Sequence, residues 1–436
     1  MTTGTPDLPD GASLDLARAR MGVVFSPNQI LGRTQPVGCT AVEITQRCNL
    51  DCTLCYLSEH SESVRDIPLE EVFARLDRIR SSYGAGTHVQ ITGGDPALRK
   101  HAELIAIVRH ARNAGLYPAL FTNGIAASRS LLSSLAAAGL CDVAFHVDTT
   151  QRRPGFATEA ALHAVRDEYL ARARGLPLNV IFNTTVHGAN VHEVPDLVRY
   201  FVAHADQVGM ASFQMQADTG RGEWGARPDS LSLGLVRSLV NTGSGSALPW
   251  EVIRVGHPLC HSYVPTLVFA DRVVPVVEDV QLFGEFLRDF GQEAGSGPVP
   301  LRAVRNVPGW TVLRAWGLAL ARRPRWLLRG LRELSRILRR AGPGWLLHGV
   351  PPRKLSFFVH NFMDARHLDP ERVEACSFMV MTHKGPVSMC AHNARRDEYI
   401  LAPLAVRQRD GSVVNFEPLQ ARRNRQASAS PDAVSP

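Results

Sequence analysis

The chain has 436 residues, of which 45% are hydrophobic, and its net charge is +7. This length and apolar content are enough for one large α/β domain with a second, smaller unit, so the protein is expected to be globular. The eight cysteines are too sparse for a disulfide scaffold, and no run of eighteen uncharged apolar residues is present that would span a membrane.

The first residues show no regular hydrophobic period. Residues 1–35 are punctuated by Pro, Gly and Asp, and we interpret 1–37 as an N-terminal extension. No basic region followed by an apolar run opens the chain, so no secretion signal is expected. We therefore expect a cytoplasmic protein whose thiols stay reduced and free to bind metal.

From about residue 40 the chain alternates short β-branched runs with helical patterns. The predicted strands are Ala41–Thr45, Val89–Thr92, Pro118–Thr122, Asp142–Asp148, Asn179–Val186 and Ala211–Gln216. The predicted helices are Leu69–Ser81, Ala102–Ala114, Arg129–Ala138, Glu159–Arg174 and Val194–His204. Six βα units predict an α/β fold in which a parallel sheet curls into a partial, TIM-like (β/α)6 barrel over residues 38–216. Ligand sites in such folds lie at the carboxyl ends of the strands.

Three cysteines, Cys48, Cys52 and Cys55, follow the first predicted strand in a C-x3-C-x2-C pattern. Thiolates are soft ligands that select zinc, copper(I) or iron–sulfur clusters, and a cubane [4Fe–4S] cluster takes one ligand per iron. Three cysteines therefore leave one iron open for chemistry. A structural zinc site would use all four positions on protein ligands, which argues against a zinc knot.

With Tyr56 directly after the third cysteine, this segment resembles the radical S-adenosylmethionine superfamily. The resemblance extends over roughly residues 38–216 and implies that the open iron binds the amino and carboxylate groups of S-adenosylmethionine. It also implies that the reduced cluster cleaves this cofactor to a 5′-deoxyadenosyl radical, which abstracts hydrogen from an unactivated carbon. The implied cofactors are a [4Fe–4S] cluster and S-adenosylmethionine, and the implied partner is an electron donor such as ferredoxin or flavodoxin.

A glycine pair follows the second predicted strand, in Gly93-Gly94-Asp95-Pro96. Two glycines let the backbone turn sharply and approach a ligand closely. In the superfamily this loop, usually with Glu at the third place, binds the amino group of S-adenosylmethionine, and Asp95 keeps the acceptor chemistry on a shorter arm. An ordinary βα turn is the alternative.

Polar residues also end the later strands, where the resemblance places ribose and substrate contacts. Thr122 and Asn123 end the third strand, and a polar residue here lies near the cofactor in the superfamily, although a plain turn is equally compatible. The remaining polar strand ends are Asp148, Asn183 and Thr185. We favour the interpretation of His146 as a hydrogen-bonded core histidine, with a role in the site as the alternative.

Residues 217–250 are rich in Gly and Ser and predict a linker or mobile loop, followed by a less regular C-terminal region, 251–420. This region holds a second group of cysteines, Cys260, Cys376 and Cys390. None of them lies in a hydrophobic periodic run, which weakens the interpretation as inert core thiols. Cys39 and Cys141 lie at the starts of predicted strands and are interpreted as core residues, with a ligand role as the alternative.

The segment around the last two cysteines resembles a subgroup of the superfamily that includes the archaeal tetraether-lipid synthase and a pterin methyltransferase. These proteins carry auxiliary iron–sulfur clusters and an upstream H-P-x-C, present here as residues 257–260. The matching downstream residues are Phe362, Met363, Asp364, Asp369, Glu371, Arg372, Val373, Cys376, Gly385, Cys390 and Asn393. The resemblance implies that the second group of cysteines shares an auxiliary cluster whose fourth ligand is not identified. Structural cysteines are the alternative.

Nine arginines and one acid, Glu333, lie between residues 314 and 340 and account for the basic excess of the chain. Within 309–349, apolar residues recur at near-helical spacing between the arginines, with Trp310, Trp316 and Trp345 nearby. A basic amphipathic helix edged by tryptophan suits an anionic membrane surface or an amphiphilic substrate. A solvated helical face packed on the barrel is the alternative. No nucleic-acid-binding motif accompanies the charge, so nucleic acid is not expected as a partner.

Residues 421–436 are polar and predict a disordered tail. The subgroup resemblance and the basic helix both favour a lipid or amphiphilic substrate, with peripheral contact at the inner membrane face. Methyl transfer to a pterin-like small molecule and radical modification of a peptide are the alternatives. A non-catalytic, metal-stabilised scaffold is a different class of function, which cleavage of S-adenosylmethionine would exclude.

Overall fold

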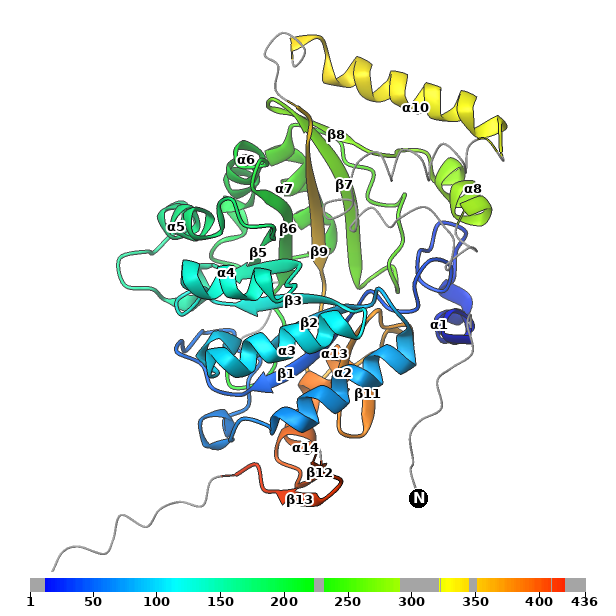
Figure 1. Cartoon of the computed structure of the whole chain (residues 1–436). Helices are drawn as coiled ribbons and strands as arrows, with labels where there is room; N and C mark the ends of the chain where they lie inside the picture. The colour runs from blue at the N-terminus through cyan, green and yellow to red at the C-terminus, as the bar shows by residue number, and fades with distance from the viewer. Residues whose placement is uncertain are drawn as a thin grey trace, which may run out of the picture.

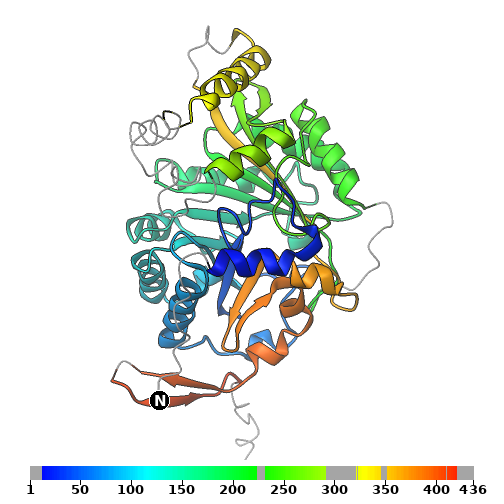
Figure 2. The ribbon, with the colours of Figure 1, turned by 90° about the vertical axis from the view of Figure 1, so that its right-hand side faces the viewer.

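The computed structural model describes residues 12–222, 231–290, 321, 323–344, 351–408 and 410–419. These residues form a mixed α/β fold around a curled sheet of eleven strands (Figure 1). Helices cover the outer, convex face of the sheet, and Figure 2 shows the same arrangement from the side. The predicted α/β half-barrel is therefore confirmed.

Parallel strands form the middle of the sheet in chain order. They are β1 (Cys39–Thr45), β2 (His88–Gly93), β3 (Tyr117–Thr122), β4 (Asp142–His146), β5 (Asn179–Val186) and β6 (Val208–Met215). The intervening helices are α2 (Leu69–Tyr83), α3 (His101–Asn113), α4 (Arg129–Ala137), α5 (His163–Ala173) and α6 (Val194–Ala203). All six predicted strands and all five predicted helices are present. The largest differences are in α5, which begins four residues later than predicted, and in β6, which begins three residues earlier.

Burial on both faces explains why these segments are strands. All seven residues of β1 are buried, as expected for a parallel strand covered on both sides. On the helices, apolar residues at helical spacing face the sheet: α2 buries Val72, Leu76 and Ile79 in this way. These three side chains belong to one core cluster that fills the layer between the sheet and the outer helices.

The C-terminal region joins the same sheet at both ends, which corrects the prediction that it is less regular. At one end β9 (Arg353–His360) pairs in parallel with β6, and the antiparallel strands β7 (His261–Phe269) and β8 (Arg272–Pro275) follow. At the other end β10 (Phe378–Thr382) pairs in parallel with β1, and β11 (Gly385–Ser388) pairs antiparallel with β10. Strands distant in the sequence therefore extend both walls of the half-barrel.

A helix, α7 (Leu233–Ser244), lies within residues 217–250, where the sequence indicates a linker. Ser232 caps its N-terminus, and the helix buries Val236 and Val240 in the main core cluster. The prediction is wrong for this part because the apolar positions of α7 recur at helical spacing among Gly, Ser and Asn residues, which dominated the composition. Residues 223–230 lie outside the described part of the chain.

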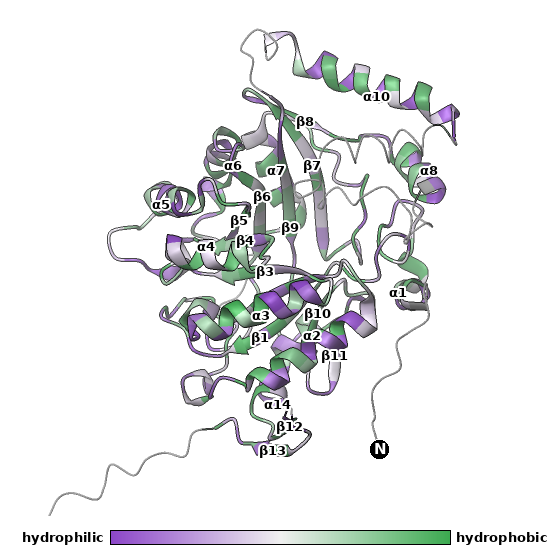
Figure 3. Cartoon of the chain, viewed as in Figure 1, coloured by the Kyte–Doolittle hydropathy of each residue, from purple (hydrophilic) through white to green (hydrophobic). Residues whose placement is uncertain are grey.

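The remaining elements are α1 (Ala12–Met21), α8 (Val280–Phe290), α10 (Arg325–Ala341), α12 (Pro370–Glu374), α13 (Met389–Ala394), α14 (Asp397–Ile400), β12 (Leu404–Arg407) and β13 (Val413–Phe416). Helix α10 is the predicted basic helix, and it carries alternating bands of apolar and polar residues (Figure 3). The rest of the predicted 309–349 segment, apart from 321, 323–324 and 342–344, lies outside the described residues. So do residues 1–11 and the predicted tail, 421–436. Within the described ranges, no helix is both long and apolar enough to cross a membrane.

Candidate functional site

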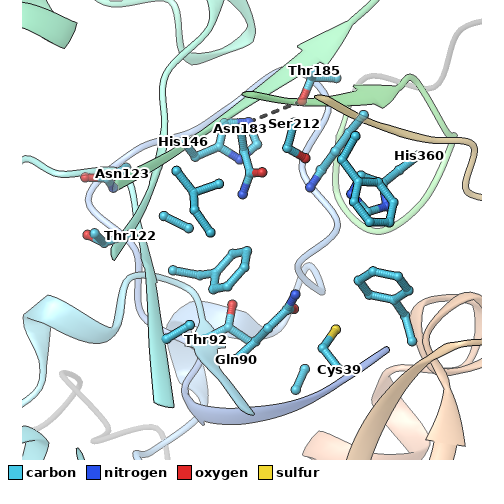
Figure 4. Close-up of a pocket in the computed structure, with 18 of the residues that line it drawn as sticks. Cys39, Gln90, Thr92, Thr122, Asn123, His146, Asn183, Thr185, Ser212 and His360 are labelled. Carbon is cyan, nitrogen blue, oxygen red and sulfur yellow. Dashed lines mark hydrogen bonds between the residues drawn. The ribbon is translucent and has the colours of Figure 1, made fainter. Parts of the chain in front are cut away.

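The inner face of the half-barrel encloses a cavity of about 600 Å³. Figure 4 shows Gln90, His146, Asn183 and Ser212 arranged around this space. A complete barrel fills its interior with bulky branched side chains. Here three strands instead place small residues on the lining, and these are Ala41, Ala119 and Ala144. The small side chains leave room for ligands inside the barrel.

Cys48, Cys52 and Cys55 lie in the loop after β1, and all three line the cavity as free, partly exposed thiols. Thr53 N in the same loop donates to Thr150 O at 2.9 Å, which ties the loop to the end of β4. Burial raises the pKa of Cys48 and of Cys52, and neighbouring thiols act in the same direction. The thiols of Cys48 and Cys52 therefore stay protonated unless a metal takes the place of the proton.

Three free thiols on one cavity provide the three protein ligands of a [4Fe–4S] cluster. Within the described residues, no three His, Cys, Asp or Glu side chains converge in a way that would hold one metal ion. A [4Fe–4S] cluster does not require such convergence, because each thiolate binds a different iron. Three separate thiols that face one cavity thus fit a cluster with three protein ligands and one open iron.

The segment after β6 covers the cysteine loop from the other side. Arg221 N donates to Leu57 O at 2.7 Å. Gly220 has φ +63°, and a Cβ on it would lie 2.3 Å from the carbonyl carbon of Tyr56. Only a glycine lets two backbones approach this closely. The sequence contains this Gly-Arg-Gly run, but its composition indicated only a linker and did not relate it to the cysteine loop.

Gly93 and Gly94 allow the second loop to pack against the backbone that leads into the cysteine loop. Gly93 has φ +129°, and a Cβ on Gly94 would lie 2.0 Å from Arg47 O. Gly94 N donates to Thr45 O at 2.9 Å, and the Tyr56 hydroxyl donates to Gly93 O at 2.5 Å. The close approach predicted for these glycines is therefore made to the protein's own backbone. Both glycines, and Tyr56, also line the cavity.

Asp95 is hydrogen bonded within the protein, which differs from the expectation that it accepts from the cofactor. Its fully buried carboxylate accepts from Ala97 N at 2.9 Å, Thr122 Oγ1 at 2.9 Å and Asn123 N at 3.0 Å. Neither Asp95 nor Pro96 lines the cavity. Burial raises the pKa of Asp95 even with these donors. The carboxylate therefore joins the loop after β2 to the end of β3.

Asn123 and Asn183, both predicted to lie near the cofactor, are buried and line the cavity. Asn123 Nδ2 donates to Asn49 Oδ1 at 2.6 Å, and the same nitrogen lies 3.8 Å from Cys48 Sγ. Asn123 therefore orients the cysteine loop. The predicted site residues that the structure brings around one cavity are Cys48, Cys52, Cys55, Tyr56, Gly93, Gly94, Asn123 and Asn183.

Asp148 does not line the cavity but holds a histidine that does. His146 Nε2 lies 2.6 Å from Asp148 Oδ2, which also accepts from Thr185 N at 2.7 Å. Burial opposes a positive charge on His146, but the Asp148 carboxylate raises its pKa. Burial also opposes ionisation of Asp148, yet His146 lowers its pKa well below the usual range. The interpretation of His146 as a core histidine is wrong, because its side chain is 34% exposed and lines the cavity.

A buried ion pair that the sequence analysis missed lies beside the cysteine loop. Glu43 in β1 pairs with Arg396, whose guanidinium carbon lies 4.6 Å from the centre of the Tyr56 ring. Both charged residues line the cavity. Burial alone would raise the pKa of Glu43, but Arg396 and His392 lower it to about 2. The sequence signal for this pair was the carboxylate of Glu43 within a strand that is otherwise uncharged. Arg396 could not be identified as its partner, because it lies 353 residues further along the chain.

The fold brings the second group of cysteines together. Cys260, Cys376 and Cys390 are all buried. Burial, followed by the neighbouring thiols, raises the pKa of Cys260 to about 11 and that of Cys390 to about 12. Arg372 Nε donates to Cys260 Sγ at 3.3 Å, and Met363 N donates to Cys390 Sγ at 3.5 Å. Backbone hydrogen bonds from Phe378 and Met389 likewise act to lower the pKa of Cys376, so each of the three sulfurs has a donor that would stabilise a thiolate.

Other residues of the C-terminal motif hold this region in place. Asp369 caps α12 by accepting from Glu371 N at 2.9 Å, and Glu371 Oε1 lies 3.1 Å from His257 Nε2. Asp364 Oδ1 accepts from Asp218 N at 2.8 Å. The motif thus links the second group of cysteines to the turn before β7 and to the segment that covers the cysteine loop.

An aromatic wall lines the side of the cavity nearest the second group of cysteines. It consists of Phe358, His360, Phe362 and Phe378. The rings of Phe358 and His360 stack at 4.1 Å between centroids, and Cys376 Sγ donates to Phe378 O at 3.0 Å. His360 Nδ1 lies 3.1 Å from His261 Nδ1, and burial lowers the pKa of His360 to about 3. The histidine pair therefore stays neutral. The alternating pattern of β9 was the sequence signal for this wall, but β9 was not predicted.

Comparisons with known proteins agree with this geometry. A family model described as the radical SAM superfamily matches residues 42–201. A PqqA peptide cyclase from Bradyrhizobium diazoefficiens is 31% identical over 179 residues, which cover 40% of this chain and 46% of that protein. A 7,8-dihydro-6-hydroxymethylpterin dimethyltransferase from Methanocaldococcus jannaschii is 27% identical over 186 residues, which cover 41% of this chain and 36% of that protein.

Solved structures also match part of the chain. The FeFe-hydrogenase maturase HydG from Carboxydothermus hydrogenoformans matches with a TM-score of 0.39 and 8% identity over 56% of this chain and 64% of its own. Streptococcus suis SuiB bound to S-adenosylmethionine matches with a TM-score of 0.37 and 14% identity over 46% of this chain and 45% of its own. The chain spans less than half the length of the two curated relatives above. Residues 42–201, which run from β1 to α6, therefore form a radical SAM domain.

Proposed function

We propose that this protein is a radical SAM enzyme whose Cys48, Cys52 and Cys55 hold a [4Fe–4S] cluster. When bound and reduced, this cluster would supply the chemistry of its superfamily, which is cleavage of S-adenosylmethionine to a 5′-deoxyadenosyl radical that abstracts hydrogen from an unactivated carbon. One observation carries the proposal. Three free thiols, the number of protein ligands that leaves one iron open, line the same cavity as Gly93 and Gly94.

The protein's own residues would position the reactants and exclude water. Asn123 and the Tyr56 hydroxyl hold the cysteine loop against the neighbouring strand ends. His146, held by Asp148, is placed to donate or accept a proton at the cavity, because its pKa is raised by that carboxylate. A substrate that fills the interior of the half-barrel would displace water and keep a radical away from side reactions.

For the substrate we propose a lipid or another amphiphilic molecule. The aromatic wall and the three small alanines give the cavity an apolar interior, and the His261–His360 pair adds no charge to it. Charged lining residues lie at the two ends of the cavity. Glu43 and Arg396 lie near the thiols, and Asp142, Asp206, Arg353 and Lys354 lie where β4 and β9 begin. An apolar interior between polar ends suits a molecule of mixed polarity.

A pterin-like small molecule is the second candidate substrate. The stacked rings of Phe358 and His360 offer a flat surface, and Gln90, Asn183 and Gln214 offer amide groups to a heteroaromatic ring. The relative from Methanocaldococcus jannaschii is named a pterin dimethyltransferase. Peptide modification rests on the name of the PqqA peptide cyclase relative. Among the described lining residues, none selects a peptide over a small molecule.

We propose in addition that Cys260, Cys376 and Cys390 hold an auxiliary iron–sulfur cluster. The support is their shared position and the donors to Cys260 and Cys390 from Arg372 and Met363, since hydrogen bonds to cluster sulfurs tune and stabilise such sites. The fourth ligand stays open. The proposed electron donor is a ferredoxin or flavodoxin. We place the protein in the cytoplasm, with peripheral contact to the inner membrane face.

The reaction is tested by measuring 5′-deoxyadenosine. Anaerobically reconstituted protein, reduced in the presence of S-adenosylmethionine, is expected to release 5′-deoxyadenosine. The combined Cys48→Ala, Cys52→Ala and Cys55→Ala variant is expected to release none. Cys141→Ala is the matched control, because Cys141 is also a free, partly exposed thiol but does not line the cavity. Undiminished release from the triple variant would refute the proposed site.

The substrate class is tested by isotope transfer. Cells grown in deuterated medium provide lipid, pterin and peptide fractions, and each fraction is incubated with the reduced enzyme. Deuterium in 5′-deoxyadenosine marks the fraction that lost hydrogen to the radical. We expect transfer from the lipid fraction. Transfer from the pterin fraction alone would establish the second candidate instead.

A further inference from the structure

Helix α10 carries a stripe of exposed leucines. Their exposed fractions range from 42% to 67%, and the residues are Leu327, Leu328, Leu331, Leu334 and Leu338. Four of them recur at spacings of three or four residues and therefore lie along one side of the helix. We call the exposed side formed by these five leucines the leucine face. Single exposed apolar residues are ordinary, but a contiguous apolar stripe on a helix marks an interaction site.

Side chains at the two ends of α10 and on its other sides anchor the helix to the protein, so the leucine face belongs to a fixed element. Trp326 and Ala341 are buried, and Trp326 Nε1 donates to Asp289 Oδ2 at 2.8 Å. Arg329 pairs with Glu285 of α8, and Arg336 donates to Val276 O at 3.0 Å. In Figure 1 α10 lies beyond β8 at the edge of the molecule. These contacts hold the helix while leaving its outer face uncovered by described residues.

Two arginines flank the leucine face and are not used in that anchoring. Arg332 and Arg339 are exposed, and neither forms an ion pair with any residue in the described ranges. At 100° per residue, both lie about a quarter turn or more from the centre of the leucine face. The exposed side of α10 thus has an apolar centre and a basic edge, which is the pattern of a helix that lies in a membrane interface.

We propose that the leucine face of α10, with Arg332 and Arg339 at its edge, docks on an anionic lipid bilayer. The leucines would enter the region between head groups and acyl chains, and the arginines would meet anionic phosphates. A second copy of the chain fits less well, because a two-fold contact through this face would bring its own arginines together. Nucleic acid would leave the leucines without apolar contacts.

Docking in this orientation would also bring the bilayer close to one end of the cavity. This entry route rests on the proposed lipid substrate, whereas the docking surface itself does not. Arg353, the first residue of β9, lines the cavity, and Arg272, the first residue of β8, lies beside Gly342 at the end of α10. Because β8 and β9 are both antiparallel to β7, these two strands begin at the same edge of the sheet. One end of the cavity and the end of α10 therefore share that edge, where an amphiphile from the bilayer would enter.

Binding is tested by sedimentation of the full chain with vesicles. The wild type is expected to sediment with phosphatidylglycerol vesicles at low salt and much less with phosphatidylcholine vesicles. Added salt is expected to weaken binding, because charges at the lipid surface are screened. No binding of the wild type to phosphatidylglycerol vesicles at low salt would overturn the proposal.

Two variants separate the apolar and the charged contributions. Arg332→Gln with Arg339→Gln is expected to lower the partition coefficient about thirtyfold. Its control, Arg80→Gln with Arg109→Gln, removes two exposed arginines from α2 and α3 and is expected to change the partition coefficient much less.

The second variant, Leu331→Gln with Leu334→Gln, is expected to lower binding at least tenfold. Its control is Leu16→Gln, which changes an exposed leucine on α1. Arg329 and Arg336 are unsuitable because they anchor α10.

Sedimentation velocity without lipid gives the competing outcome. A wild-type dimer that the leucine variant abolishes would show that the face binds a second copy, and this would also overturn the lipid proposal. Release of 5′-deoxyadenosine from soluble S-adenosylmethionine is measured in the same variants and is expected to stay at the wild-type level. Failure of vesicle binding with normal cofactor cleavage would therefore reject the docking surface while leaving the proposed reaction intact.

Discussion

At the scale of single residues, the site combines neighbours in the sequence, such as the three cysteines of one loop, with side chains that are distant in the sequence. The cysteine spacing and Tyr56 predicted a cluster loop because three ligands within eight residues need no tertiary information. The role of Asp95 could not be predicted in the same way, because the direction of its carboxylate depends on donors in β3. Arg396 and Glu43 meet only in the folded chain. The sequence therefore predicts a site made of neighbouring residues, but it does not predict contacts between residues that are far apart in the chain.

Adding one methyl group at Gly94 is predicted to destabilise the protein. Gly94→Ala would place a Cβ 2.0 Å from Arg47 O, so the loop must move away from the cysteine loop. We expect a loss of roughly 2 kcal/mol or more in unfolding free energy, together with reduced iron content after reconstitution. Gly330→Ala is the control, because a Cβ there meets nothing within 4 Å and the helix should gain stability. Wild-type stability and iron content in Gly94→Ala would contradict this account.

The Glu43–Arg396 pair predicts a specific dependence of stability on pH. The folded-state pKa of Glu43, about 2, is below the unfolded value of about 4.3, so its stabilisation is present above about pH 5 and is lost as pH falls. The difference corresponds to about 3 kcal/mol at neutral pH, of which about half is lost by about pH 3. Glu43→Gln should therefore be destabilised by about 3 kcal/mol at pH 7, with a smaller deficit near pH 3.

Urea unfolding at the two pH values measures this difference. Glu168→Gln is the matched control, because Glu168 forms an exposed pair with Arg172 and should contribute no more than about 0.5 kcal/mol at either pH. A deficit in Glu43→Gln that is equally large near pH 3, or absent at pH 7, would rule out the ion pair as the source of the stability.

At the scale of elements, the periodic pattern predicted the six βα units because strands and helices bury their residues with different periods. The same reasoning missed α7 and the strands β7 to β11. Helix α7 is rich in Gly, Ser and Asn, and these residues indicate loops when read alone. The late strands are short or separated by irregular segments, and their partners, such as Met210 for Ser356, are distant in the sequence.

This strand order predicts that the barrel segment does not fold by itself. In a fragment of residues 38–216, β1 and β6 would both become edge strands, because β10 and β9 cover them in the intact chain. Exposed, apolar edge strands associate with one another. We expect the fragment to aggregate, whereas the full chain should be monodisperse in size-exclusion chromatography. A soluble fragment with a cooperative thermal transition would show that 38–216 is an independent domain.

At the scale of the whole molecule, the half-barrel and the C-terminal region meet at one cavity. Cysteine groups from both parts adjoin it, the first as part of the lining and the second behind Phe378 of the aromatic wall. The C-terminal region therefore contributes to the site as well as to the sheet. The auxiliary cluster stays a proposal, and the cysteines that would bind it do not line the cavity.

Iron analysis of two variants tests for the second cluster. The variant with Cys48, Cys52 and Cys55 replaced by Ala should keep part of the wild-type iron and sulfide, because the second group of cysteines is intact. The variant with Cys260, Cys376 and Cys390 replaced by Ala should also keep part of them. Circular dichroism checks that both variants are folded. A folded first variant without any iron would leave a single-cluster enzyme as the better account.

The central claim is that Cys48, Cys52 and Cys55 leave one iron open to S-adenosylmethionine inside the cavity. Electron paramagnetic resonance of the reduced protein tests it most directly, because a ligand at the iron changes the spectrum of the cluster. The account predicts that adding S-adenosylmethionine shifts the signal of the wild type, and that this signal is missing when the three cysteines are replaced by Ala. A cluster signal in the wild type that does not respond to S-adenosylmethionine would contradict the account.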